Sequence, residues 1–107
     1  MKGSLSTFFE INDELRLYTI LTRNFTLGCM LYLIVLTDDE FMHMWIYKTL
    51  KDWRDDFGFI TIWDKWRFDR LPYIETERKK CKGVWGTYYH LKRDMLNKAI
   101  KELAQRS

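Results

Sequence analysis

Basic and aromatic side chains alternate in the second half of the chain, and they are the residues best suited to chemistry. Residues 65–70 read Lys-Trp-Arg-Phe-Asp-Arg, and residues 78–82 form a dense basic cluster. Lys and Arg bind phosphates and release counterions whatever the base sequence, and exposed aromatic rings can stack on unpaired bases. The pattern predicts contact with DNA or RNA. The candidate nucleic-acid-binding residues are Arg67, Arg70, Arg78, Lys79, Lys80, Lys82, Lys92 and Arg93.

The charge distribution agrees with this prediction. Residues 1–64 carry six Lys/Arg and ten Asp/Glu, a net charge of −4, whereas residues 65–107 carry twelve and five, a net charge of +7. Such asymmetry is typical of a protein with an anionic partner. The alternative is that the two halves mix in three dimensions and their charges cancel.

The aromatic content suggests a second class of function. Five Trp, six Tyr and seven Phe occur in 107 residues. Most should be buried in the core, but Trp and Tyr are also enriched in protein interfaces. The alternative function is therefore a protein-binding inhibitor or accessory factor of viral or mobile-element type, and a homodimer would present two basic patches. The candidate interface residues are Tyr47, Trp53, Trp63 and Trp85.

Few residues suggest a metal site or a catalytic site. The two histidines and two cysteines lack zinc-ligand spacing. The five glycines form no phosphate-binding loop, and the chain has no Gly-x-Ser-x-Gly motif. We expect no metal, no cofactor and no catalytic residue.

Two short stretches bear on enzymatic activity. Residues 17–22 resemble the first strand motif of rolling-circle replication endonucleases, and residues 88–92 (Tyr-Tyr-His-Leu-Lys) resemble their Tyr-x-x-Lys motif. The resemblance implies a helical tyrosine that attacks a DNA phosphate beside a supporting lysine. In that family two histidines on one strand bind the metal, but the strand expected at 59–63 has none. Without its Lewis acid the mechanism fails, so the sequence favours a non-enzymatic binding protein.

The elements around these residues predict one α+β domain over residues 1–107. The apolar run Leu27–Leu36 predicts a strand buried on both faces, because it barely alternates. Thr37 and Glu40 fit a capping box ahead of a central helix over about 38–57. Residues 59–63 predict a further strand. We expect a mixed or antiparallel sheet of four to six strands.

The remaining segments leave one alternative open. Residues 66–71 alternate like an edge strand, 73–77 can pair with them, and a C-terminal helix is expected over about 87–105. Residues 6–23 fit either a hairpin or a helix. If they are helical, the chain becomes mainly helical and winged-helix-like. Residues 66–77 would then form the wing, and the last helix would serve in dimerisation.

Cysteine use and hydropathy predict an intracellular, cytoplasmic protein. Cys29 lies in an apolar run and Cys81 in a basic one, so the first is expected to be buried and a disulfide is not expected. The first residues lack a signal-peptide pattern. The longest apolar run is about half the length that a membrane-spanning helix needs.

Overall fold

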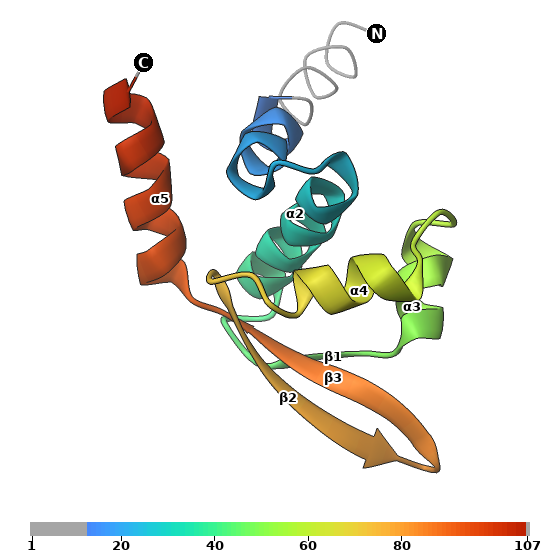
Figure 1. The fold of residues 1–107 in the computed structure, drawn as a ribbon. Helices are drawn as coiled ribbons and strands as arrows, with labels where there is room; N and C mark the ends of the chain where they lie inside the picture. Colours follow the sequence, from blue (N-terminus) through green and yellow to red (C-terminus); the bar gives the residue numbers. More distant parts are fainter. Residues whose placement is uncertain (1–12, 107) are drawn as a thin grey trace, which may run out of the picture.

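The computed structural model describes residues 13–106 and has an α+β fold with a three-stranded antiparallel sheet (Figure 1). Its elements follow in the order helix Asp13–Thr22, α2 (Phe25–Glu40), β1 (Ile46–Lys48), α3 (Leu50–Asp56), α4 (Ile62–Phe68), β2 (Ile74–Cys81), β3 (Val84–Leu91) and α5 (Arg93–Arg106). The mixed class and the antiparallel sheet confirm the prediction, but the expected four to six strands are wrong.

The sheet has β3 in the middle, with β1 and β2 on either side. The long β2–β3 hairpin pairs from Ile74 opposite Leu91 to Cys81 opposite Val84. Lys82 and Gly83 form its turn with φ angles of 51° and 80°. Two residues with positive φ are what a type I′ turn requires, and glycine accepts this conformation without strain.

The core lies where the helices meet the sheet. Met30 and Ile34 of α2 are fully buried, as are Trp53 of α3, Phe68 of α4 and Tyr89 of β3. The three aromatic rings pack edge to face, with centroids 5.2 to 5.7 Å apart. This geometry suits the ring quadrupoles. The cluster joins α3, α4 and β3 into one body.

Two capping boxes determine where α3 and α4 begin. Thr49 caps α3 together with Asp52, and Thr61 caps α4 together with Asp64. In each pair the threonine oxygen accepts the backbone N–H of the aspartate, and the carboxylate accepts the backbone N–H of the threonine. These reciprocal bonds satisfy N–H groups that the first turn would leave free. Their Thr-x-x-Asp pattern is visible in the sequence.

The predicted strand over residues 27–36 is wrong, because this run forms most of α2. A helix that is apolar on nearly all sides has no clear periodicity, and most residues of this run are buried in the core. The predicted cap at Thr37 is also wrong. Thr37 lies inside α2, and its hydroxyl donates to the carbonyl of Leu33 at 2.7 Å.

The predicted central helix over 38–57 is wrong as well. The chain leaves α2 at Glu40, and Met42 and His43 adopt positive φ angles of 55° and 66°, which a helix cannot contain. Strand β1 and the short helix α3 occupy the rest of that segment. Residues 59–61 precede α4 and do not form the expected strand.

The C-terminal helix begins at Arg93, because residues 87–91 belong to β3. Within residues 6–23, the part that the structure describes is the helix Asp13–Thr22, which agrees with the helical alternative; residues 6–12 lie outside the described range. Helix, strand, two helices and hairpin in this order resemble a winged helix. Its hairpin, however, spans 74–91 and not 66–77.

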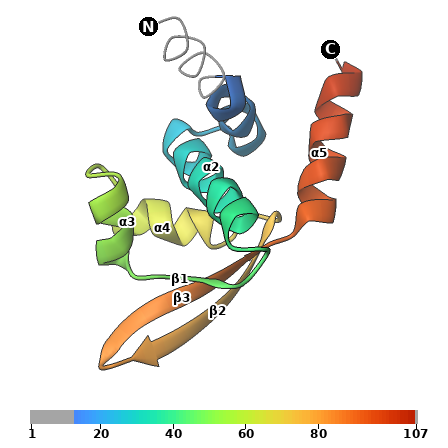
Figure 2. The same ribbon diagram turned by 180° about the vertical axis from the view of Figure 1, so that it is seen from behind.

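Both views show the helices on one side of the sheet and α5 running beside the helix Asp13–Thr22 (Figures 1 and 2). Cys29 is buried as predicted, and both cysteines are free thiols. Within residues 13–106, no single helix has the length and apolarity to cross a membrane. The helix Asp13–Thr22 and α2 meet that criterion only as a pair, bent by 119°.

Candidate nucleic-acid interface

The β2–β3 hairpin has two chemically different faces, because side chains alternate along a strand. Ile74 is buried against the helices, so Thr76, Arg78 and Lys80 share this inner face. The opposite, outer face of β2 carries Glu75, Glu77, Lys79 and Cys81. Both acidic residues of β2 therefore lie on the outer face, and its inner face carries only neutral and basic side chains.

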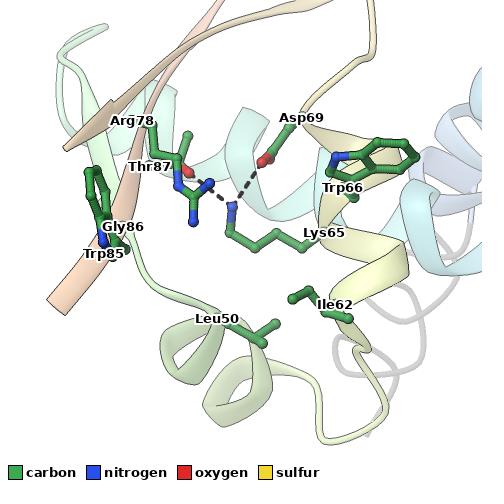
Figure 3. Close-up of a pocket in the computed structure, with 9 residues that line it drawn as sticks. All are labelled: Leu50, Ile62, Lys65, Trp66, Asp69, Arg78, Trp85, Gly86 and Thr87. Carbon is green, nitrogen blue, oxygen red and sulfur yellow. Dashed lines mark hydrogen bonds and ion pairs between the residues drawn. The ribbon is translucent and has the colours of Figure 1, made fainter. Parts of the chain in front are cut away.

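A groove lies between the inner face of the hairpin, α4 and the start of α3 (Figure 3). Its volume is about 290 Å³. The residues that line it are Leu50, Ile62, Lys65, Trp66, Asp69, Arg78, Trp85, Gly86 and Thr87. Trp66 and Trp85 come from opposite walls, and the guanidinium of Arg78 points into the space between them. We call this space the α4–hairpin groove.

A hydrogen-bond network forms the floor of the α4–hairpin groove. The ammonium group of Lys65 donates to Asp69 at 2.8 Å and to the hydroxyl of Thr87 at 2.9 Å. Asp69 also accepts from the hydroxyl of Tyr89, which in turn accepts from the indole N–H of Trp53 at 3.2 Å. Burial, together with the negative charge of Asp69, raises the pKa of Tyr89 far above its usual value. The side chain of Tyr89 in this network is therefore a neutral phenol.

Each wall of the groove carries an arginine stacked on a tryptophan. The guanidinium of Arg70 lies 3.5 Å from the centre of the Trp66 ring, and that of Arg78 lies 5.2 Å from the Trp85 ring. Such cation–π contacts hold the guanidinium over the ring face while its N–H groups remain available. The groove thus combines flat aromatic surfaces with fixed positive charge.

The acidic residues of α4 do not offset this charge at the surface. Asp64 caps the helix and Asp69 is bonded to Lys65 and Tyr89. Five of the predicted nucleic-acid-binding residues form no ion pair with any other described residue. These five are Arg67, Arg70, Arg78, Lys80 and Lys82. Arg67 lies on α4, Arg70 lies just after its C-terminus, and the other three lie on the hairpin.

Three of the predicted cations lie elsewhere. Lys79 is on the outer face, where it pairs with Glu77 at 3.4 Å and lies over Tyr88. Lys92 and Arg93 follow β3 at the end of the hairpin opposite its turn. Strand alternation and strand length therefore separate these three residues from the other candidates.

Arg93 has a structural role that the sequence did not indicate. Its Nε donates to the buried carboxylate of Asp38 at 2.7 Å, and its other side pairs with Asp39. His43 contacts the same Asp38 oxygen through Nδ1 at 2.7 Å. Burial alone would raise the pKa of Asp38, but these hydrogen bonds outweigh it and hold the pKa below its usual value. These ion pairs connect the start of α5 to the end of α2.

The predicted protein interface is not one surface. Trp53 is fully buried in the core, so its assignment to an interface was wrong. Tyr47 lies on the outer face of the sheet against Tyr88, with ring centroids 4.9 Å apart. Trp85 lies on the inner face, and Trp63 is exposed on α4 beside Trp66.

Trp66 and Lys65 were missed as site residues, although their stretch was recognised as basic and aromatic. A strand period predicted one face for Trp66 and the other for Arg67. The Thr61–Asp64 capping signal could have corrected this, because it starts a helix at Ile62. On a helix, Trp63, Trp66 and Arg70 are spaced by three and four residues and share one side.

The features that resembled rolling-circle endonucleases are placed differently in the structure. Residues 17–22 are helical and not a strand, and Tyr88 and Tyr89 lie in β3 and not in a helix. Tyr89 is buried and bonded to Asp69. Within the described part of the chain, no group of three or more His, Cys, Asp or Glu could hold a metal ion. These two motifs therefore do not form that family's site.

Comparisons of the chain with protein-family models, with curated proteins and with solved structures found no match.

Proposed function

We propose that the protein binds nucleic acid through the α4–hairpin groove. The supporting observation is that five cations on α4, just after it and on the hairpin have no ion pair among the described residues, while both acids of β2 lie on the far face. Phosphates attract such a surface through counterion release, which is independent of sequence. These five cations are part of the net positive charge that residues 65–107 carry.

The arrangement of elements also suits a nucleic-acid backbone. Helix α4 has seven residues and is about 10 Å long, and the hairpin projects beside it (Figure 1). In helix-turn-helix proteins the second helix contacts the nucleic acid while neighbouring segments contact phosphates. Here α4 follows α3 after a short connection and exposes Trp63 and Arg67. The turn of the hairpin brings Lys82 to its tip.

A charge reversal on each face of the hairpin tests this proposal. Arg78→Glu and Lys79→Glu make the same charge change at adjacent positions, but only Arg78 lines the groove. Anisotropy of fluorescein-labelled single- and double-stranded DNA should show wild-type binding that weakens with salt. Arg78→Glu should weaken it about tenfold or more, and Lys79→Glu much less. Equal losses would contradict the groove, and no wild-type binding at low salt would overturn the proposal.

The salt dependence supplies an independent measure. Removing one phosphate contact should reduce the slope of log K against log salt by about one. We expect this reduction for Arg78→Ala and for Lys80→Ala, and no reduction for Lys79→Ala. A slope that is unchanged in all three variants would show that the inner face contacts no phosphate.

A protein contact is the second candidate function, and a different surface favours it. Phe41, Met42, Met44 and Trp45 are exposed by 55%, 84%, 67% and 44% between α2 and β1. Exposed apolar clusters of this kind mark interaction sites. A homodimer through this loop should dissociate in Met42→Glu when mass is measured by sedimentation equilibrium. A wild-type protein that is monomeric at micromolar concentrations would contradict this candidate.

A further inference from the structure

Two half-exposed tryptophans line the α4–hairpin groove, one from α4 and one from the hairpin. Trp66 of α4 is 51% exposed and Trp85 of β3 is 55% exposed, and both line the same space (Figure 3). Phosphate binding alone requires neither ring, because phosphates are recognised by cations and N–H groups. A surface that served only for charge would not need two large exposed apolar rings in its lining.

We propose that the groove binds an unpaired nucleobase, so that the ligand is single-stranded nucleic acid; this proposal rests on the proposed function. Bases in a duplex are stacked on one another, and their faces are closed to the protein. Single strands expose these faces, and proteins bind them with aromatic platforms inside a positively charged groove. The α4–hairpin groove has both features.

The size of the groove favours one small planar group. Its volume of about 290 Å³ lies at the lower end of the range for small-molecule sites, about 300 to 1,000 Å³. A single base between the two walls suits this space better than an extended ligand. The groups at the floor, Lys65, Thr87 and Asp69, are already bonded to each other. Stacking, which every base can provide, would therefore dominate over recognition of base edges.

The arginines complete the binding surface. Arg70 lies against Trp66, and Arg78 lies against Trp85. A base inserted between the walls would bring its own phosphate and the next one close to these guanidinium groups. The exposed Lys80 and Lys82 continue the positive surface along the hairpin towards its turn. The backbone of a strand would follow this line.

The test compares three fluorescein-labelled probes by anisotropy: oligo(dT), oligo(U) and a DNA duplex of equal length. Wild-type protein should bind a single-stranded probe more tightly than the duplex, and tryptophan fluorescence should be quenched on binding. The comparison of oligo(dT) with oligo(U) identifies DNA or RNA as the better ligand. Trp66→Ala and Trp85→Ala should each weaken single-strand binding about tenfold or more. Trp85→Phe should restore most of the affinity because it keeps a stacking ring.

Phe25→Ala is the control. Phe25 is another exposed aromatic residue, 58% exposed on α2, but it stacks on Phe59 and does not line the groove. Circular dichroism checks that each variant is folded. If Trp66→Ala unfolds, the comparison of Trp85→Ala with Trp85→Phe still tests the stacking proposal. Tighter duplex binding, or equal losses in Phe25→Ala and Trp85→Ala, would overturn the stacking proposal and leave nucleic-acid binding in place. Absence of binding to every probe would overturn both.

Discussion

The hydroxyl of Tyr89 in β3 donates a hydrogen bond to the carboxylate of Asp69, the residue that ends α4. The same hydroxyl accepts from the indole N–H of Trp53 in α3. One buried phenol thus joins the hairpin to both helices of the helix pair. Because Asp69 also lines the α4–hairpin groove, this bond connects the groove to the core.

Removing this hydroxyl should destabilise the fold. Tyr89→Phe leaves a buried indole N–H and one carboxylate interaction without a partner, which costs about 1–3 kcal/mol in the free energy of unfolding. Urea denaturation followed by circular dichroism measures the loss. Tyr88→Phe is the control, because the neighbouring hydroxyl approaches only the sulfur of Cys81, at 4.0 Å. Equal losses in the two variants would contradict a special role for Tyr89.

The same phenol should make stability depend on pH in the alkaline range. Burial and then the charge of Asp69 raise the pKa of Tyr89 above its ordinary value of 10.0. Since the folded state favours the neutral phenol, this contribution is complete below pH about 10 and falls as pH rises further. Urea midpoints measured from pH 8 upwards should decline less steeply in Tyr89→Phe than in wild type. Parallel profiles would contradict this assignment.

Asp38 should contribute stability that disappears in acid. Its carboxylate is 1% exposed and bonded to Arg93 and His43, and its pKa lies below the ordinary value of 3.8. Because the folded state favours the charged form, the contribution is present above pH about 4 and is lost as pH falls through the folded pKa. Asp38→Asn should cost about 1.5–3 kcal/mol at pH 7.

The neighbouring Asp39→Asn is the control for Asp38, because Asp39 is exposed and pairs only with one side of Arg93. Its loss should be below about 1 kcal/mol. Thermal unfolding at pH 7 and pH 3 measures both variants. A loss in Asp38→Asn that stays constant between the two pH values would show that the charge of this carboxylate is not what matters.

Gly28 should be indispensable where the helix Asp13–Thr22 crosses α2. An added Cβ would lie 2.8 Å from the Cα of Thr19 and 2.9 Å from its backbone nitrogen, which cannot move independently of the helix. Gly28→Ala should therefore destabilise the protein by about 1–3 kcal/mol. At Gly58 a Cβ meets nothing within 4 Å, so Gly58→Ala should be nearly neutral. Denaturation midpoints that coincide would disprove the close approach.

Local signals in the sequence determined several features correctly. Gly83 is in the hairpin turn, where a positive φ suits glycine, and the Thr-x-x-Asp pattern at Thr61 marks the start of α4. The burial of Cys29 follows from its apolar neighbours. These features are local, because they depend on residues within about four positions of each other.

The tertiary structure alone decided the rest. The run 27–36 is apolar on every side, so only its neighbours made it a helix and not a strand. Trp53 and Trp63 are the same residue type in similar helices, yet one is fully buried and the other is 67% exposed. Arg78 and Lys79 face opposite ways because Ile74 is held in the core. The sequence by itself determined which charges and rings the chain carries, whereas long-range packing decided which of them meet across the groove.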